Sequence, residues 1–447
     1  MKKKILTTVL FVLGVGNILL AQNKNWSIHL QQTVISQHKP AIKAPYQGEN
    51  SLSDTAETQT SLTTTLYIAR RLWSGAALYF NPELAGGGGL SQARGIAGFT
   101  NGECFRIGDP APSVYVARLF MRQDFALGEE RSSTNSKVVE GERHGSPLSR
   151  EEDGLNSIQG DRPTNRLTLV AGKFSIADYF DNNSYAHDPR TQFMNWSLMS
   201  NGAWDYPANT RGYTWSFLVE YMRENWGMRY ASSLVPTYAN GPTLNWAWSG
   251  NQSNTFEIEH KTKVKGLEGK VRLLAFYTLT KMGNYDLASA MSQPDITATR
   301  IAGRNKYGIG LNIEQALSAD AGVFFRASIN DGKNETWAFT EIDQAISAGY
   351  VNNKPFGREN DAFGVAIAMN GISSQHRNYL NKGGYGFIIG DGKLPNYSTE
   401  NILELFYSAK IRDWFTISPN YQFIANPAYN TDRGPVHAFA LRVHAEF

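Results

Sequence analysis

The sequence predicts an all-β protein: a transmembrane antiparallel β-barrel of about 16 strands, with long loops partly folded into the lumen. Segments of about ten residues alternate between apolar and polar side chains, and clusters of Gly, Asn, Asp and Pro separate them. After residue 21, no apolar run is long enough for a transmembrane helix. The mean hydropathy of −0.37 agrees with this prediction, because only every second strand residue of such a barrel faces lipid.

The C-terminal segment has the clearest alternation. Apolar side chains occupy one face, at Phe439, Leu441, Val443, Ala445 and Phe447. The opposite face carries Arg442, His444 and Glu446. A last strand that ends in Phe447 resembles the sorting signal read by the barrel-assembly machinery. The same alternation recurs over residues 213–221, 307–314, 323–330, 363–370, 403–411 and 415–423. The apolar face of the first of these segments is expected to begin at Tyr213.

The N-terminus has the layout of a secretory signal peptide, and residues 1–21 are expected to be removed. Three lysines, Lys2 to Lys4, precede a mostly apolar stretch that ends at Leu20, and Ala21 offers a small side chain for cleavage. Residues 22–447 are then expected to form a single barrel domain in the outer membrane of a Gram-negative bacterium.

Charge and cysteine content exclude several function classes. The segment 1–21 holds three of the 43 basic residues and none of the 40 acidic residues, so the remaining chain has no net formal charge. A neutral chain lacks the basic footprint of a nucleic-acid-binding protein, and no nucleic-acid partner is expected. Cys104 is the only cysteine, so neither an intrachain disulfide nor a cysteine-based metal site is possible.

Two long connections separate the alternating segments. Residues 126–164 are rich in charged and small residues and predict a long polar loop. Residues 178–211 hold many aromatic side chains, and the pattern permits a short helix over 188–199. A loop with that apolar content packs on other parts of the protein, and inside a barrel it can fold into the lumen and narrow it.

No motif predicts an enzyme, a cofactor or a metal site. The glycines at 86–89 lack the following Lys-Ser or Lys-Thr of a phosphate loop. The histidines show no metal-ligand spacing, and no nucleophile elbow occurs. A carboxylate pair for glycoside hydrolysis could come from one stretch, although Asp there is also an ordinary turn residue. The carboxylates of that stretch are Asp178, Asp181, Asp188 and Asp205.

Charged side chains fall on the polar face of several predicted strands. An Arg on the lipid face costs roughly 2–4 kcal/mol at mid-bilayer, so the alternation assigns these side chains to the lumen. They are Arg71, Arg118, Arg122, Glu257, Glu259, Lys261, Lys263, Arg272, Arg326 and Glu404. They could simply form a solvated pore wall, or they could form a constriction that selects solutes by charge and hydrogen bonding.

Several motifs, in order along the chain, resemble the OprB-type carbohydrate-selective porin family. They are Leu78–Glu83, Gly95–Gly108, Val114–Gln123, Ala171–Ser175, His187–Trp196, Asn201–Pro207, Thr210–Trp215 and Asn426–Pro435. The resemblance extends from about Trp26 to Phe447. It implies an outer-membrane barrel, often of about 16 strands, that admits glucose-like sugars by passive diffusion without ATP or a cofactor.

The alternation of inward and outward residues along the predicted strands, together with this resemblance, identifies candidate residues for a sugar-selective constriction. A sugar presents hydroxyls at its rim and C–H groups on its faces, so the constriction needs both polar and aromatic side chains. Candidates for hydroxyl binding are Arg94, Glu103, Arg106, Arg118 and Arg122. Candidates on the aromatic loop are Tyr185, Arg190, Trp196, Trp204 and Asp205. Arg94 and Arg106 could instead pair with Glu103 or Asp109, and the two tryptophans could instead pack the loop.

Other functions stay open on the sequence alone. The barrel could be a general channel or a channel for amino acids or organic acids. It could also be an outer-membrane hydrolase, or an adhesin or structural barrel plugged by its loops. The expected partners are outer-membrane lipid, the barrel-assembly machinery and sugar solutes, and the protein could be a monomer or a homotrimer.

Overall fold

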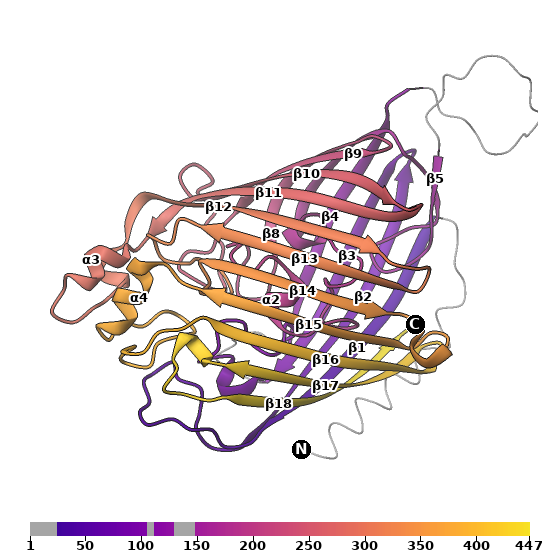
Figure 1. The fold of residues 1–447 in the computed structure, drawn as a ribbon. Coiled ribbons are helices and arrows are strands. Elements are labelled where there is room, and N and C mark those ends of the chain that lie inside the picture. Colours follow the sequence, from indigo (N-terminus) through magenta and orange to yellow (C-terminus); the bar gives the residue numbers. More distant parts are fainter. Residues whose placement is uncertain (1–24, 105–110, 129–147) are drawn as a thin grey trace, which may run out of the picture.

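The computed structural model describes residues 25–104, 111–128 and 148–447. Within these residues, sixteen strands close into a barrel, and each strand pairs with its neighbours in antiparallel order (Figure 1). The barrel strands are β1 (Trp26–Lys39), β2 (Glu57–Trp73), β3 (Ala76–Gly87), β4 (Ser113–Ala126), β7 (Arg166–Phe174), β8 (Thr214–Met222), β9 (Trp226–Leu234), β10 (Gln252–Val264), β11 (Leu267–Met282), β12 (Ile301–Ala316), β13 (Ala321–Asn330), β14 (Gln344–Asn352), β15 (Ala362–Gly371), β16 (Glu400–Arg412), β17 (Phe415–Ala425) and β18 (Val436–Glu446). The predicted fold class is confirmed.

The remaining elements of the described residues are short. A separate two-stranded sheet contains β5 (Leu148–Glu151) and β6 (Gly160–Pro163). The helices are α2 (Trp196–Met199), α3 (Tyr285–Ser289) and α4 (Ser374–Asn381), with 3-10 turns η1 (Leu90–Gln92), η2 (Ile176–Asp178), η3 (Thr297–Thr299), η4 (Pro355–Gly357) and η5 (Pro427–Tyr429). In the described part of the chain, no helix has the length and apolar character needed to cross a membrane.

The first and last strands close the barrel. β1 pairs with β18 from Gln31 opposite Glu446 to His38 opposite Phe439. Two further backbone bonds join the chain end to β1: the N–H of Phe447 donates to the carbonyl of Leu30 at 2.9 Å, and the N–H of Leu30 donates to Phe447 at 3.0 Å. This closure pairs backbone groups that an open sheet edge would present to lipid.

The alternation of side chains matches the two faces of the barrel wall. In β13, Phe325 and Ile329 are 36% and 51% exposed on the outer surface, whereas the intervening Arg326 is 1% exposed. Phe439 is likewise exposed and Arg442 is buried in β18. One assignment was wrong: Tyr213 lies before the start of β8 and is buried rather than lipid-facing, because the strand period does not extend into the loop.

The two ends of the barrel differ. At the end where the C-terminus lies, which we call the turn end, connections such as 74–75, 265–266 and 413–414 are short. The opposite loop end carries the longer connections, including those with α3 and α4 (Figure 1). Short turns face the periplasm in bacterial outer-membrane barrels, which orients the turn end toward the periplasm.

Two predicted segments fall wholly or partly outside the described residues. Residues 1–21, expected to be a signal peptide, lie outside them. So do residues 129–147 of the predicted polar loop 126–164. The described remainder of that loop contains the β5–β6 pair, in which Leu148 lies opposite Pro163.

Candidate solute-binding site

The connection between β7 and β8, residues 175–213, runs through the lumen of the barrel. Inward-facing side chains from several strands bind its backbone. Arg326 of β13 donates to the carbonyls of Leu198 and Ala186, both at 2.7 Å. From β16, Glu404 accepts the N–H groups of Met194 at 2.6 Å and Asn195 at 2.9 Å. These side chains supply the partners that a loop inside a barrel does not obtain from a strand ladder.

Contacts with β18 explain why the short helix that the sequence permits over 188–199 is limited to α2. The guanidinium of Arg442 on β18 binds three carbonyls of the preceding stretch, at 2.6–2.9 Å. They belong to Pro189, Thr191 and Gln192. Because these carbonyls point to the wall, most of this stretch stays extended or turned rather than helical.

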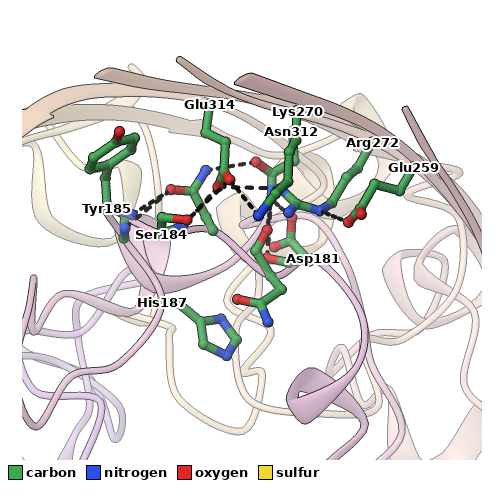
Figure 2. Close-up of polar contacts among 12 residues, drawn as sticks. Asp181, Ser184, Tyr185, His187, Glu259, Lys270, Arg272, Asn312 and Glu314 are labelled. Atoms are coloured by element: carbon green, nitrogen blue, oxygen red, sulfur yellow. Dashed lines mark hydrogen bonds and ion pairs between the residues drawn. The ribbon is translucent and has the colours of Figure 1, made fainter. Parts of the chain in front are cut away.

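Asp181 is the centre of a second set of contacts to this loop (Figure 2). Its carboxylate accepts the backbone N–H of Asn201 at 2.6 Å, the side-chain amide of Asn312 at 2.6 Å and Nε of Arg326 at 3.2 Å. Asp181 and Arg326 are each 1% exposed, so their charges are paired away from water. The aromatic loop is therefore fixed to β12 and β13 by a buried polar network.

Beside this loop lies a cavity of about 340 Å³, which we call the central cavity. Strand and loop residues of both ends of the barrel line it. They are Gln31, Tyr67, Gly102, Glu103, Arg118, Leu155, Asn156, Ser175, Ala177, Asp178, His187, Asp188, Pro189, Arg190, Trp196, Met199, Ser200, Tyr206, Arg211, Gly212 and Tyr213. Of the predicted constriction residues, Glu103, Arg118, Arg190 and Trp196 meet here.

Arg190 organises one wall of the central cavity. Its Nε lies 2.8 Å from Glu103, and its Nη2 lies 3.0 Å from Glu83. Its Nη1 donates to Gln31 at 2.7 Å and to Tyr67 at 3.1 Å. Although burial alone would lower the pKa of Arg190, these acidic partners raise it well above its usual value. The guanidinium is thus a permanently charged donor held in one orientation.

A second ion pair faces the cavity. Arg118 binds Asp178 through two hydrogen bonds, of 2.7 Å from Nε and 2.6 Å from Nη2. Its guanidinium also lies 5.2 Å from the ring centre of Tyr213. The hydroxyl of Tyr213 donates to Glu83 at 3.1 Å, and Glu83 also binds Arg190. Tyr213 therefore contacts both the Arg118–Asp178 pair and the Arg190–Glu83 pair. Such a planar two-bond pair has little freedom to rotate.

Aromatic rings form another part of the wall. Trp196 stacks on Phe339 with ring centres 4.6 Å apart, and it also contacts Phe99 at 5.0 Å. Tyr206 lies between Trp196 and Trp204, with ring-centre distances of 6.2 Å and 5.1 Å. Trp196 and Tyr206 line the central cavity, whereas Trp204 does not and packs the loop.

Asp205 also stays outside the central cavity. Its carboxylate accepts the backbone N–H groups of Trp337 at 2.8 Å and Ala338 at 2.7 Å. Burial raises the pKa of Asp205 to about 6, and the nearby ammonium of Lys306 offsets the effect only in part. Asp205 therefore joins two loops rather than offering an acceptor to a solute.

The other predicted site residues are placed apart from the cavity or outside the described residues. Arg94 is half-buried and donates to the carbonyl of Glu49 at 3.4 Å. Arg122 binds Glu151 at 2.9 Å and 2.7 Å, nearer the turn end. Arg106 lies outside the described residues.

Tyr185 packs on the inner wall at β13 and lines a cavity of about 600 Å³ at the turn end. A Cβ on Gly322 would lie 2.0 Å from its ring, so the glycine makes room for it. The neighbouring Ser184 and Lys270 both bind Glu314, at 2.7 Å and 3.1 Å (Figure 2). Glu314 and Tyr185 line the 600 Å³ cavity.

Several residues that line the central cavity or bind its lining were not nominated from the sequence. Glu83, which binds Arg190, lies on the inner face of β3, and Gln31 and Tyr67 lie on the inner faces of β1 and β2. Strand parity would have assigned them to the lumen. Asp178 was considered only as a catalytic carboxylate or as a turn residue, not as part of the constriction. Among the described residues, no group of three or more His, Cys, Asp or Glu side chains is arranged to hold a metal ion.

A closed barrel with an apolar outer face, a charged lumen and a polar internal cavity defines an outer-membrane porin. Residues 49–447 match the OprB family of carbohydrate-selective porins, and the chain belongs to this family. The protein is therefore an outer-membrane porin for the passive diffusion of carbohydrates.

Individual proteins are similar to this chain in sequence or in fold. The chain is 23% identical to Porin B of Pseudomonas aeruginosa over 333 residues, which cover 66% of this chain and 70% of that protein. The structure of Pseudomonas putida OprB at high pH has a TM-score of 0.68 and 16% identity, and the match covers 95% of this chain and 94% of that chain. The outer-membrane channel DcaP of Acinetobacter baumannii has a TM-score of 0.50 at 7% identity, over 94% and 97% of the two chains. These structural matches show a shared fold.

Proposed function

We propose that the central cavity is the constriction at which this porin selects monosaccharide-sized sugars. Its volume of about 340 Å³ lies at the lower end of the range for small-ligand sites, roughly 300–1,000 Å³. The observation that carries the proposal is that paired charges and aromatic rings meet around one cavity in the lumen. The ion pairs can bind sugar hydroxyls, and the rings of Trp196 and Tyr206 can face its C–H groups.

The charge balance of the cavity favours neutral solutes. Its lining contains three arginines and three carboxylates: Arg118, Arg190, Arg211, Glu103, Asp178 and Asp188. Arg118 already binds Asp178 and Arg190 already binds Glu103, and positive and negative side chains are equal in number. An ion entering the cavity therefore gains little net attraction, and its own desolvation cost remains. A neutral polyol can add hydrogen bonds at the remaining lone pairs and N–H groups without breaking an ion pair. Weak contacts of this kind also let the solute leave.

Single-channel conductance with glucose tests this proposal. We expect glucose to block the ion current of the wild-type porin, because sugar and ions share one passage. Arg118→Ala removes a charged donor from the wall, and we expect the glucose concentration for half-block to rise about tenfold, as for one charge-assisted hydrogen bond.

A control variant and a comparison of solute classes make the conductance experiment specific. Lys354→Ala changes a half-exposed side chain on a turn and should leave the glucose block unchanged. Liposome swelling with glucose, amino acids and carboxylates compares the solute classes. Equal or faster entry of organic acids than of glucose would contradict the proposed selectivity.

We also infer how the porin reaches its membrane. Residues 1–21 would direct export and be cleaved, and Phe447 would be read by the barrel-assembly machinery. The pairing of Phe447 with Leu30 supports a role at barrel closure. The porin would act without a catalytic step. Mass spectrometry of the outer-membrane form tests the cleavage: an intact N-terminus would rule it out.

A further inference from the structure

One connection at the turn end is unlike the others at that end. The connection from β4 to β7, residues 127–165, is long, whereas the neighbouring turn at 74–75 is short. Its residues 148–163 fold into the β5–β6 pair, with Glu151 opposite Gly160. We call residues 148–163 the inner hairpin.

Ion pairs hold the inner hairpin against the barrel wall. Glu151 binds Arg122 of β4 through two hydrogen bonds, of 2.9 Å and 2.7 Å. Arg162 binds Asp124 of the same strand through two bonds of 3.0 Å. These wall side chains belong to the inward face of β4, since both are 8% exposed. This part of the hairpin is therefore bound to the inward face of β4 near the turn-end rim of the barrel, where Figure 1 shows β5.

Contacts with β2, β3 and β4 hold the tip of the inner hairpin against the inner wall. The carbonyl of Gln159 accepts a hydrogen bond from Arg71 of β2 at 2.8 Å. Ile158 is 2% exposed and belongs to the buried cluster that includes Tyr79 and Phe120. The side-chain oxygen of Asn156 accepts from Asn81 of β3 at 2.7 Å. Residues from β2, β3 and β4 thus fix the tip of the hairpin.

The inner hairpin separates two cavities. Leu155 and Asn156, at its tip, line the central cavity together with Arg118 and Arg190. A different cavity of about 360 Å³ has Glu151, Ile158 and Arg162 in its wall, along with residues of the 74–75 turn. Hence the hairpin contacts the central cavity on one side and a cavity at the turn end on the other.

We propose that the inner hairpin is a selectivity element for the solute, and that Leu155 and Asn156 contact the sugar on its way to the periplasm. The proposal rests on the central cavity being the sugar constriction. The amide of Asn156 can exchange hydrogen bonds with hydroxyls, and Leu155 can contact the C–H face of a pyranose ring. The ligand class is a neutral hexose-like polyol. Loop-end residues and a turn-end insertion would then select the solute together.

Point variants at the tip test this inference. We expect Asn156→Ala and Leu155→Ala each to raise the glucose concentration for half-block about fivefold, as when one neutral contact is lost. Replacing residues 152–159 with a short Gly-Ser linker joins the two cavities, so we expect a higher conductance and faster liposome swelling with disaccharides. Glu359→Ala, on another turn of the same end, is the matched control.

The outcomes distinguish this inference from the proposed function. If glucose does not block the wild-type porin, the sugar constriction itself is wrong. If Arg118→Ala weakens the block while Asn156→Ala and Leu155→Ala leave it unchanged, the constriction stands and the hairpin has no selective role. Both point variants keep the ion pairs of Glu151 and Arg162, and heat-modifiable gel mobility reports whether each barrel is folded.

Discussion

At the scale of single residues, the lumen is built from charges that are paired out of water. Arg190 makes contacts to Glu83, Glu103, Gln31 and Tyr67 with the nitrogens of one guanidinium. Lysine has the same charge but cannot reproduce this fork of donors. Removing one partner of such a group leaves the others buried without compensation, at a cost of roughly 3–5 kcal/mol. The cavity wall is accordingly sensitive to single substitutions.

Asp205 gives a pH-dependent prediction at this scale. Burial raises its pKa to about 6 from 3.8, so the native loop binds a proton that the unfolded chain releases. Stability from this group is greatest below about pH 4 and is lost as the pH rises through about 6. Between pH 5 and 7 the protection of the Trp337 and Ala338 amides should fall by roughly 1 kcal/mol.

Hydrogen exchange, corrected for intrinsic rates, measures that protection. Asp205→Asn keeps one acceptor and cannot ionise, so its protection should not change over this pH range. A slope in the variant equal to that of the wild type would assign the pH dependence to another group.

At the scale of elements, a buried histidine joins three connections at the loop end. His376 of α4 is fully buried, and its Nδ1 lies 3.0 Å from Asp343 in the loop before β14. Its ring stacks on Tyr285 of α3, with ring centres 4.2 Å apart. Although burial alone would raise the pKa of Asp343, Lys306 and His376 lower it. One side chain therefore connects α3, α4 and the 331–343 loop.

We expect His376→Ala to loosen these connections without opening the barrel. Loss of the ring leaves Asp343 with fewer partners and Tyr285 without its stack, which costs roughly 1–3 kcal/mol locally. Limited proteolysis should then cut within 283–300 and 372–399 faster than in the wild type. Asn378→Ala, an exposed change on the same helix, is the control. Equal cleavage rates for both variants would show that His376 does not hold these loops.

At the scale of the whole molecule, stability depends on the contrast between the outer and inner faces of the wall. Ile309 of β12 is 56% exposed on the outer face, where its neighbour is lipid. We expect Ile309→Arg to destabilise the barrel by roughly 2–4 kcal/mol near mid-bilayer. Leu317→Arg, on the turn after β12, should cost roughly 0–1 kcal/mol because it lies near the interface.

Reversible urea unfolding in lipid vesicles, followed by tryptophan fluorescence, gives both free energies. A similar cost for the two arginines would mean that position 309 is not in the hydrocarbon region. The loop-end and lumen contacts are shared by both variants, so they do not contribute to the difference.

How much of the fold and of the site could be predicted depends on how far along the chain each sequence pattern extends. The two-residue period of a strand is local, so it assigned Phe439 and Arg442 to opposite faces and predicted about 16 strands. The period ends with the strand, and for that reason Tyr213 was placed on the wrong face. Loop side chains have no period, and the choice between solute contact and packing for Trp196 and Trp204 could not be made before the loop was seen in the lumen.

The sequence by itself determined the barrel, its faces and its family, because alternation and ordered motifs are written along the chain. Only the tertiary structure decided which charges meet. Asp181 pairs with Arg326, and Arg190 pairs with Glu83, across loops that no local pattern relates. It also placed the tip of the inner hairpin in the lumen, against β2, β3 and β4. The physical reason is that two inward side chains can pair only if they lie close together around the circumference of the barrel. Their positions around the circumference are defined only when the first and last strands pair and close the barrel.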